Sequence, residues 1–148
     1  MDRISEAAQA IVSARRSRSP LSVLPLWLRP QDEAEAYHIQ EAVHEGLTAS
    51  GWGPLVGYKI GCTTPVMQQY LGIETPCAGG VFAGRVHASG VALGPSAFLR
   101  VGVECEIAVR LGRDLPLSDA PFTAEGVSQA ITFYTLAFVS RLAGLLRR

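Results

Sequence analysis

Alternating hydrophobic and polar positions are clearest in residues 100–114, RVGVECEIAVRLGRD. Apolar side chains occupy every second position, at Val103, Cys105, Ile107, Val109 and Leu111. This period of two predicts a β-strand with one apolar and one polar face. Glu104 and Glu106 fall on the polar face, so their Cα atoms are expected to lie about 6.6–6.8 Å apart and their side chains to point the same way.

Two segments near the N-terminus have helical spacing instead. Residues 2–16 carry a stripe of apolar residues at three- and four-residue intervals, with Asp2 placed to cap the helix. Residues 31–49 repeat the same spacing behind an acidic start. The prolines at positions 20, 25 and 30 exclude a regular helix between the two, so we expect a connector that Trp27 anchors to the core.

Shorter elements are predicted further along. Residues 55–62 have strand character, and Thr64 can cap a short helix over residues 66–71. The glycine-rich passage that follows predicts turns between short strands, at residues 80–82, 85–87 and 91–93. Thr123 can cap a helix beginning near Ala124. Residues 131–146 are almost continuously apolar but too short to span a membrane, and we expect them to form an apolar helix.

Composition excludes several classes of partner. Thirteen basic residues balance thirteen acidic ones, and charged residues make up 18% of the chain, so neither nucleic-acid binding nor a polybasic membrane contact is indicated. The 48% hydrophobic content of these 148 residues favours one compact or oligomeric domain. The first residues predict a helix rather than a signal peptide. Three scattered cysteines indicate reduced thiols in the cytoplasm, each as a small buried residue.

The residues alone leave the role of the two carboxylates open. Two carboxylates about 5 Å apart repel by roughly 3 kcal/mol at an effective dielectric near 20. In an enclosed site a cation or a proton must relieve that repulsion, whereas on an open face the charges separate in water beside Arg110. Lys59, between Gly57 and Gly61, is likewise either a solvated lysine or a cation where the backbone leaves room. His38 and His44 are expected to be surface or packing residues.

A set of motifs in fixed order resembles the 2-keto-4-pentenoate hydratase branch of the fumarylacetoacetate hydrolase superfamily. The motifs are Ala36-Tyr37-His38-Ile39-Gln40, Val56-Gly57-Tyr58-Lys59-Ile60-Gly61, Thr64-Pro65 with Met67-Gln68-Gln69 and Leu71-Gly72, Gly80-Val81-Phe82-Ala83, Glu104-Cys105-Glu106-Ile107-Ala108, and Leu111-Gly112-Arg113-Asp114-Leu115-Pro116. Each motif is weak by itself, but their order is specific over residues 36–130.

The resemblance implies an α+β fold in which N-terminal helices precede part of a mixed, curved β-sheet. It also implies a divalent cation, Mg²⁺ or Mn²⁺, held by Glu104, Glu106 and a further acidic residue downstream. Oxygen ligands suit such cations. Lys59 aligns with the family's lysine near the substrate, where it acts as a base or holds the substrate carboxylate. The implied substrate is a small 2-keto acid or its dienoate form, and we expect a homo-oligomer.

Two positions depart from the family pattern. Pro76-Cys77-Ala78-Gly79 replaces a turn that carries an acidic residue in many relatives, and no Asp or Glu follows Glu125. The third ligand would fall near Phe138 or Val139. We therefore expect a truncated or frameshifted copy, organised as a single incomplete domain. Its expected parts are an N-terminal helix and connector at 1–30, the family-like region at 31–130 and a divergent apolar tail at 131–148.

The expected activity is metal-dependent addition of water to a 2-hydroxy-2,4-dienoate in aromatic catabolism, impaired by the truncation. Two alternatives share the metal pair, namely a 4-oxalocrotonate decarboxylase and an acylpyruvate C–C hydrolase. A third alternative is a non-enzymatic one, an inactive fragment or a pseudoenzyme that binds a partner through residues 131–146. Pocket residues beyond those recognised here would separate the enzyme alternatives.

Overall fold

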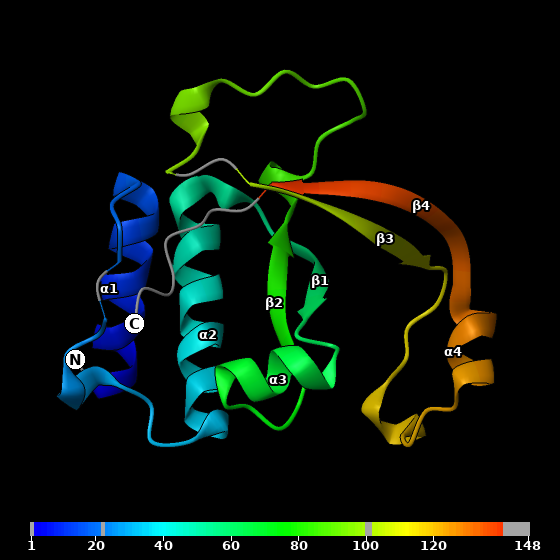
Figure 1. Ribbon diagram of the computed structural model, residues 1–148, viewed down its shortest axis with the longest axis horizontal. Coiled ribbons are helices and arrows are strands. Elements are labelled where there is room, and N and C mark those ends of the chain that lie inside the picture. Colours follow the sequence, from blue (N-terminus) through cyan, green and yellow to red (C-terminus); the bar gives the residue numbers. More distant parts are fainter. Residues whose placement is uncertain (1, 22, 100–101, 141–148) are drawn as a thin grey trace. The chain divides into compact units, whose positions relative to one another are not determined.

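The computed structural model describes residues 2–21, 23–99 and 102–140 (Figure 1). They divide into two compact units, residues 2–97 and 98–140. The first unit contains the N-terminal helices and a two-stranded sheet, and the second contains another two-stranded sheet with one helix. Lys59 therefore belongs to the first unit and the Glu104–Glu106 pair to the second. The expectation that residues 1–148 form a single incomplete domain stays a prediction.

Both N-terminal helices are confirmed, and each begins at the acidic cap that the sequence offers. Helix α1 spans Arg3–Ser17, and the Asp2 carboxylate accepts a hydrogen bond of 2.9 Å from the backbone N–H of Ser5. Helix α2 spans Glu33–Leu47, and Asp32 accepts one of 2.8 Å from the N–H of Glu35. Each cap satisfies a donor that the first helical turn leaves without an intrahelical partner. An ion pair between Arg3 and Glu35 links the two helices.

A small antiparallel sheet completes the first unit. After a π-helical turn at Thr48–Trp52, the chain forms β1 (Leu55–Gly61), α3 (Pro65–Leu71) and β2 (Cys77–Phe82). Thr64 caps α3 as expected, since its hydroxyl accepts a hydrogen bond from the N–H of Met67. The strands expected at 85–87 and 91–93 are wrong, because residues 83–85 form a 3₁₀ turn and 91–93 are irregular. Glycines at 84, 90 and 94 leave apolar runs too short for a paired strand.

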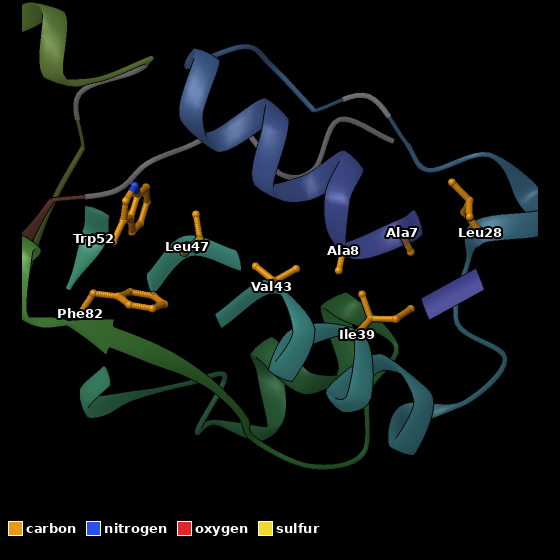
Figure 2. Close-up of a cluster of buried hydrophobic side chains, with 8 residues drawn as sticks. All are labelled: Ala7, Ala8, Leu28, Ile39, Val43, Leu47, Trp52 and Phe82. Atoms are coloured by element: carbon orange, nitrogen blue, oxygen red, sulfur yellow. The ribbon is translucent and has the colours of Figure 1, made fainter. Parts of the chain in front are cut away.

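The core lies between the two helices and the end of β2 (Figure 2). Its buried side chains come from both helices, the connector, the π-helical turn and β2: Ala7, Ala8, Leu28, Ile39, Val43, Leu47, Trp52 and Phe82. Gly46 permits the close approach of the helices, because a Cβ there would lie 2.9 Å from Cγ2 of Val12. The connector is anchored by Leu28, which is 4% exposed, and not by Trp27, which is 57% exposed.

The second unit is a long ribbon of two antiparallel strands, which are separated along the chain by a short helix. Strand β3 spans Val103–Leu111, helix α4 spans Ala124–Ala130 and strand β4 spans Ile131–Ser140. The α4 prediction is confirmed together with its cap, since Thr123 Oγ1 accepts a hydrogen bond of 3.0 Å from the N–H of Gly126. Strands β3 and β4 pair in antiparallel register from Val103 opposite Ser140 to Leu111 opposite Ile131.

The expected apolar helix at the end of the chain is wrong over its described part. Residues 131–140 form β4, and residues 141–148 lie outside the described part of the chain. The run from Ile131 to Thr135 consists of β-branched and aromatic residues, which lose rotamer freedom in a helix and pack well on a pleated sheet. Pairing with β4 also satisfies the backbone groups that β3 directs toward it, which a helix at residues 131–140 would leave unpaired.

The α+β class is confirmed, but every strand pairing described is antiparallel rather than mixed. The curved sheet of the fumarylacetoacetate hydrolase type stays a prediction. Within the described residues, no helix has the length and apolar character needed to cross a membrane.

Candidate functional site

The Glu104–Glu106 pair lies on one face of β3, as the period of two predicts. Both residues are half-buried, whereas Val103, Cys105 and Ile107, which alternate with them, are exposed. Their β4 neighbours in register are Val139, opposite Glu104, and Ala137, opposite Glu106. Residues directly opposite each other in an antiparallel pair project from the same face, with Cβ atoms about 4.5–5.5 Å apart. The carboxylate face therefore has two acidic residues on one strand and two apolar residues on the other.

The opposite face of the ribbon is apolar and open to solvent. Ile107 on β3 is 74% exposed, and Leu136, directly opposite it on β4, is 79% exposed. Phe138 on the same face is 77% exposed. This distribution reverses the simplest expectation for an alternating strand, in which the apolar face is buried and the charged face is solvated.

The donor set on the carboxylate face fits a hard divalent cation in part. Mg²⁺ commonly uses one or two protein carboxylates and completes its octahedral shell with water and substrate oxygens. Glu104 and Glu106 supply two such carboxylates. Within residues 2–21, 23–99 and 102–140, no group of three or more His, Cys, Asp or Glu side chains gathers where it could hold a metal ion.

Lys59 occupies the middle of β1 and is half-buried. Its register partner on β2 is Gly79, and its same-face neighbours along β1 are Gly57 and Gly61. A Cβ added at Gly57 or at Gly79 would meet no atom within 4 Å. The backbone beside Lys59 is therefore open at Gly57 and Gly79.

Side chains from α2 and α3 hold the backbone at the end of the β1–β2 sheet near Lys59. The N–H of Ala78 donates a hydrogen bond of 3.1 Å to the Tyr37 hydroxyl, and the Ala78 carbonyl accepts one of 3.0 Å from Gln40 Nε2. Gln68 Nε2 donates a hydrogen bond of 2.9 Å to the Cys62 carbonyl. Sequence reasoning recognised these residues as motif letters but assigned them no role. The signal that could have revealed this role is the position of these polar side chains beside the apolar residues of their helices.

The remaining candidates play structural roles or lie apart from the candidate site. His44 packs edge-on against Phe82, with ring centroids 5.6 Å apart, so the expectation of a packing histidine is confirmed for it. Burial lowers the pKa of His44, the Arg15 cation lowers it further, and Glu41 acts in the opposite direction. A hollow of about 480 Å³ lies along α1 between Gln9 and Ser17, and none of the predicted site residues lines it.

Comparison with known proteins identifies relatives of this chain, although no family model matches the sequence. A 2-keto-4-pentenoate hydratase of Paraburkholderia phymatum is 34% identical over 114 residues, which cover 77% of this chain and 43% of the relative. A 2-keto-4-pentenoate hydratase 2 of Dechloromonas aromatica is 35% identical over 111 residues, with coverages of 74% and 42%. A 2-keto-4-pentenoate hydratase of Paraburkholderia xenovorans is 33% identical over 128 residues, which cover 86% of this chain and 46% of the relative.

The chain is a homologue of the 2-keto-4-pentenoate hydratases. The resemblance drawn from the ordered motifs is thereby confirmed. The chain spans less than half the length of the curated relatives it matches, with 32–46% of their residues covered.

The register of this hydratase homologue places the expected third acidic ligand. The motif spacing pointed to Phe138 or Val139, and these two residues face opposite sides of the ribbon. Val139 stands on the carboxylate face, opposite Glu104, whereas Phe138 stands on the apolar face, opposite Cys105. Of the two candidate positions, Val139 is therefore the one on the carboxylate face, and it is apolar.

The cysteines of this hydratase homologue differ from the expectation of small buried residues. Cys77 and Cys105 are exposed, and Cys62 is half-buried. The Sγ atoms of Cys62 and Cys77 lie 3.7 Å apart. In this structure Cys77, Ala78 and Gly79 begin strand β2 rather than forming a turn. The segment has a thiol beside a second thiol where many relatives are expected by resemblance to carry an acidic residue.

Proposed function

We propose that this chain carries the cation-binding strand and the substrate-side lysine of a hydratase that adds water to a 2-hydroxy-2,4-dienoate of the 2-keto-4-pentenoate type. The observation that carries the proposal is the Glu104–Glu106 pair on one face of β3, in a homologue of 2-keto-4-pentenoate hydratases. A role in aromatic catabolism and a small 2-keto acid or dienoate substrate belong to the same proposal.

Glu104 and Glu106 are proposed to hold Mg²⁺ or Mn²⁺ through carboxylate oxygens. When bound, the cation would polarise the carboxylate and 2-oxygen of the substrate as a Lewis acid. The two carboxylates would hold it against β3. With Val139 and Ala137 opposite, the pair supplies two protein ligands, so we propose weaker cation binding and lower turnover than in a site with three carboxylates.

Lys59 is proposed to act on the substrate in one of two ways. As a cation it would bind the substrate carboxylate, and as a neutral amine it would take a proton from the substrate. Lys59→Arg separates them, because arginine keeps the charge but is not deprotonated at neutral pH. If Lys59→Arg retains substrate binding and turnover, the lysine binds the carboxylate, and if binding persists while turnover falls about a hundredfold or more, it transfers the proton.

Titration with Mg²⁺ and Mn²⁺ tests the proposed cation site directly. The thermal unfolding midpoint of the wild-type chain should rise with added cation, and that of Glu104→Gln/Glu106→Gln should not. The glutamine variant preserves side-chain size while removing the charge. Loss of dienoate ultraviolet absorbance, measured with and without cation, then tests hydration. Equal midpoints of the wild type and the variant at all cation concentrations would refute the site.

A second candidate is a chain that binds cation and ligand without turnover. The observation that favours it is Val139, an apolar residue at the position opposite Glu104. A cation-dependent shift together with undetectable dienoate loss supports this candidate over the hydratase. Product analysis on a panel of small keto acids separates hydration from the decarboxylase and C–C hydrolase alternatives.

Cytoplasmic location and self-association complete the proposal. Scattered cysteines and the 48% hydrophobic composition support them. Light scattering of the purified chain measures the mass in solution, and a monomeric mass over the micromolar range would contradict the homo-oligomer.

A further inference from the structure

We propose that Cys62 and Cys77 form a reversible oxidation site, in which thiol–disulfide exchange with a low-molecular-weight disulfide joins the two side chains across the end of the β1–β2 sheet. The site lies outside the proposed cation site and does not rest on the proposed function.

The sheet register brings the two thiols together. Cys77 is the first residue of β2 and stands opposite Gly61, and Cys62 is the next residue after Gly61. A Cβ at Gly61 would lie 3.6 Å from Cys77 Sγ, so the Cys77 thiol already points toward β1. The two Sγ atoms are 3.7 Å apart, within hydrogen-bond distance for sulfur. Formation of the bond requires an approach of about 1.7 Å, to a sulfur–sulfur distance near 2.05 Å.

The backbone at Cys62 also directs its side chain toward this position. Cys62 has φ +57°, in the left-handed region that side-chain-bearing residues rarely adopt. Its carbonyl accepts the hydrogen bond from Gln68 Nε2, which holds this conformation at the junction between β1 and α3. On the other strand, the bonds of Ala78 to Tyr37 and Gln40 fix the residue that follows Cys77. Hydrogen bonds from side chains of neighbouring helices therefore hold the backbone at Cys62 and next to Cys77.

Accessibility and acidity assign the order of the two steps. Cys77 is exposed and Cys62 is half-buried. The pKa of the Cys62 thiol is raised, first by its hydrogen bond with Cys77 and then by burial. The exposed Cys77 is therefore the thiol that a small disulfide reaches first.

The chemistry balances without any group beyond the small disulfide. The Cys77 thiolate attacks one sulfur of oxidised glutathione, which forms a mixed disulfide and releases one glutathione thiolate. Cys62 then loses its proton and attacks the Cys77 sulfur, which releases the second glutathione. Two protein thiols are oxidised by two electrons, one glutathione disulfide is reduced to two thiols, and the two protons pass to the released thiolates.

The bond would close a chain segment with its ends 15 positions apart, Cys62 to Cys77, which contains all of α3. Cys77 stands diagonally across the sheet from Lys59, since Lys59 is opposite Gly79. Oxidation would thus restrain the end of the strand that carries Lys59 and reduce the freedom of the unfolded chain.

The test uses the full chain with Cys105→Ser, which leaves the two thiols in question. Treatment with oxidised glutathione should produce a species lighter by two hydrogens, in about tenfold or greater excess over glutathione adducts, because the second thiol is already held near the first. Peptide mapping should join the Cys62 and Cys77 peptides. The matched controls, Cys62→Ser and Cys77→Ser in the same background, should instead each gain one glutathione. Two glutathiones on the Cys105→Ser chain, or disulfide-linked dimers, would overturn the proposal.

Thermal unfolding supplies a second measurement. The oxidised Cys105→Ser chain should unfold about 6–12 °C higher than the reduced chain, and a thiol reductant should reverse the rise. Both serine controls should keep the same midpoint under either condition. A rise of equal size in Cys77→Ser, which alters an exposed side chain, would also overturn the proposal.

Discussion

Residues 2–97 and residues 98–140 each contain a two-stranded antiparallel sheet. Among the described residues, only the first sheet places a strand side chain in the hydrophobic core. In the first unit, Phe82 at the end of β2 is 3% exposed and packs edge-on against Trp52, with ring centroids 5.5 Å apart. In the second unit, the apolar face formed by Ile107, Leu136 and Phe138 is open. Alternation along a strand thus defines two faces, whereas burial of a face requires another element to pack on it.

The largest predicted effect comes from the core of the first unit. Leu47→Ala removes a fully buried side chain and should lower the free energy of unfolding by about 2–5 kcal/mol, because it loses burial and leaves a cavity. Leu26→Ala, the same change at an exposed residue, should cost less than about 0.5 kcal/mol. Urea unfolding followed by tryptophan fluorescence measures both. Similar costs would show that the first unit does not depend on this core.

The next effect tests the carboxylate face of the second unit. Val139→Glu adds a carboxylate opposite Glu104 and should tighten Mg²⁺ binding about tenfold, or about 1.4 kcal/mol, because it adds an oxygen ligand. Leu136→Glu places the same charge on the opposite face and serves as the matched control. Calorimetric titration measures both affinities. Equal affinities for the two variants would mean that Val139 does not face the cation.

A smaller effect tests the open apolar face. The double variant Ile107→Thr/Leu136→Thr should lower the fluorescence of a bound hydrophobic dye about twofold, because it interrupts a contiguous apolar patch. Threonine retains strand propensity, so the unfolding free energy should change by less than about 0.5 kcal/mol. Leu26→Thr, at an exposed leucine of the first unit, should leave dye binding unchanged. Unaltered dye binding by the double variant would place the dye elsewhere.

The smallest predicted effect is the pH dependence of the first unit. Because the pKa of His44 is lowered in the folded protein, the unfolded chain takes up a proton at pH values where folded His44 stays neutral. Stability should therefore fall as pH decreases below about 6.5 and level off below the folded pKa. His44→Gln should remove this part of the dependence, as urea midpoints across that range will show. Identical pH profiles of wild type and variant would contradict the assignment.

Local signals predicted most of the helical structure. The caps expected at Asp2, Thr64 and Thr123 each receive their hydrogen bond, because a cap involves residues only three positions apart. Asp32, expected only as part of an acidic helix start, also acts as a cap. The β3 alternation likewise placed Glu104 and Glu106 on one face without knowledge of any partner strand.

The rest depended on contacts between distant segments. The apolar run at 131–140 has no strict alternation, so its pairing with β3 decided in favour of a strand. The same register selects Val139 rather than Phe138 for the carboxylate face, which counting along the sequence left open. In the connector, both Trp27 and Leu28 are large and apolar, and only the packing of α1 and α2 decides which one is buried.

The hydrogen bonds that Tyr37 and Gln40 make to Ala78 affect whether a further strand can add to the first sheet. At Ala78, both backbone groups of β2 that point away from β1 are occupied by side chains of α2. A strand from another chain would have to displace these side chains before it could pair with β2 at this point. Helix α2 therefore closes the β2 edge of the sheet at Ala78, where a further strand could pair only at the cost of two hydrogen bonds to α2.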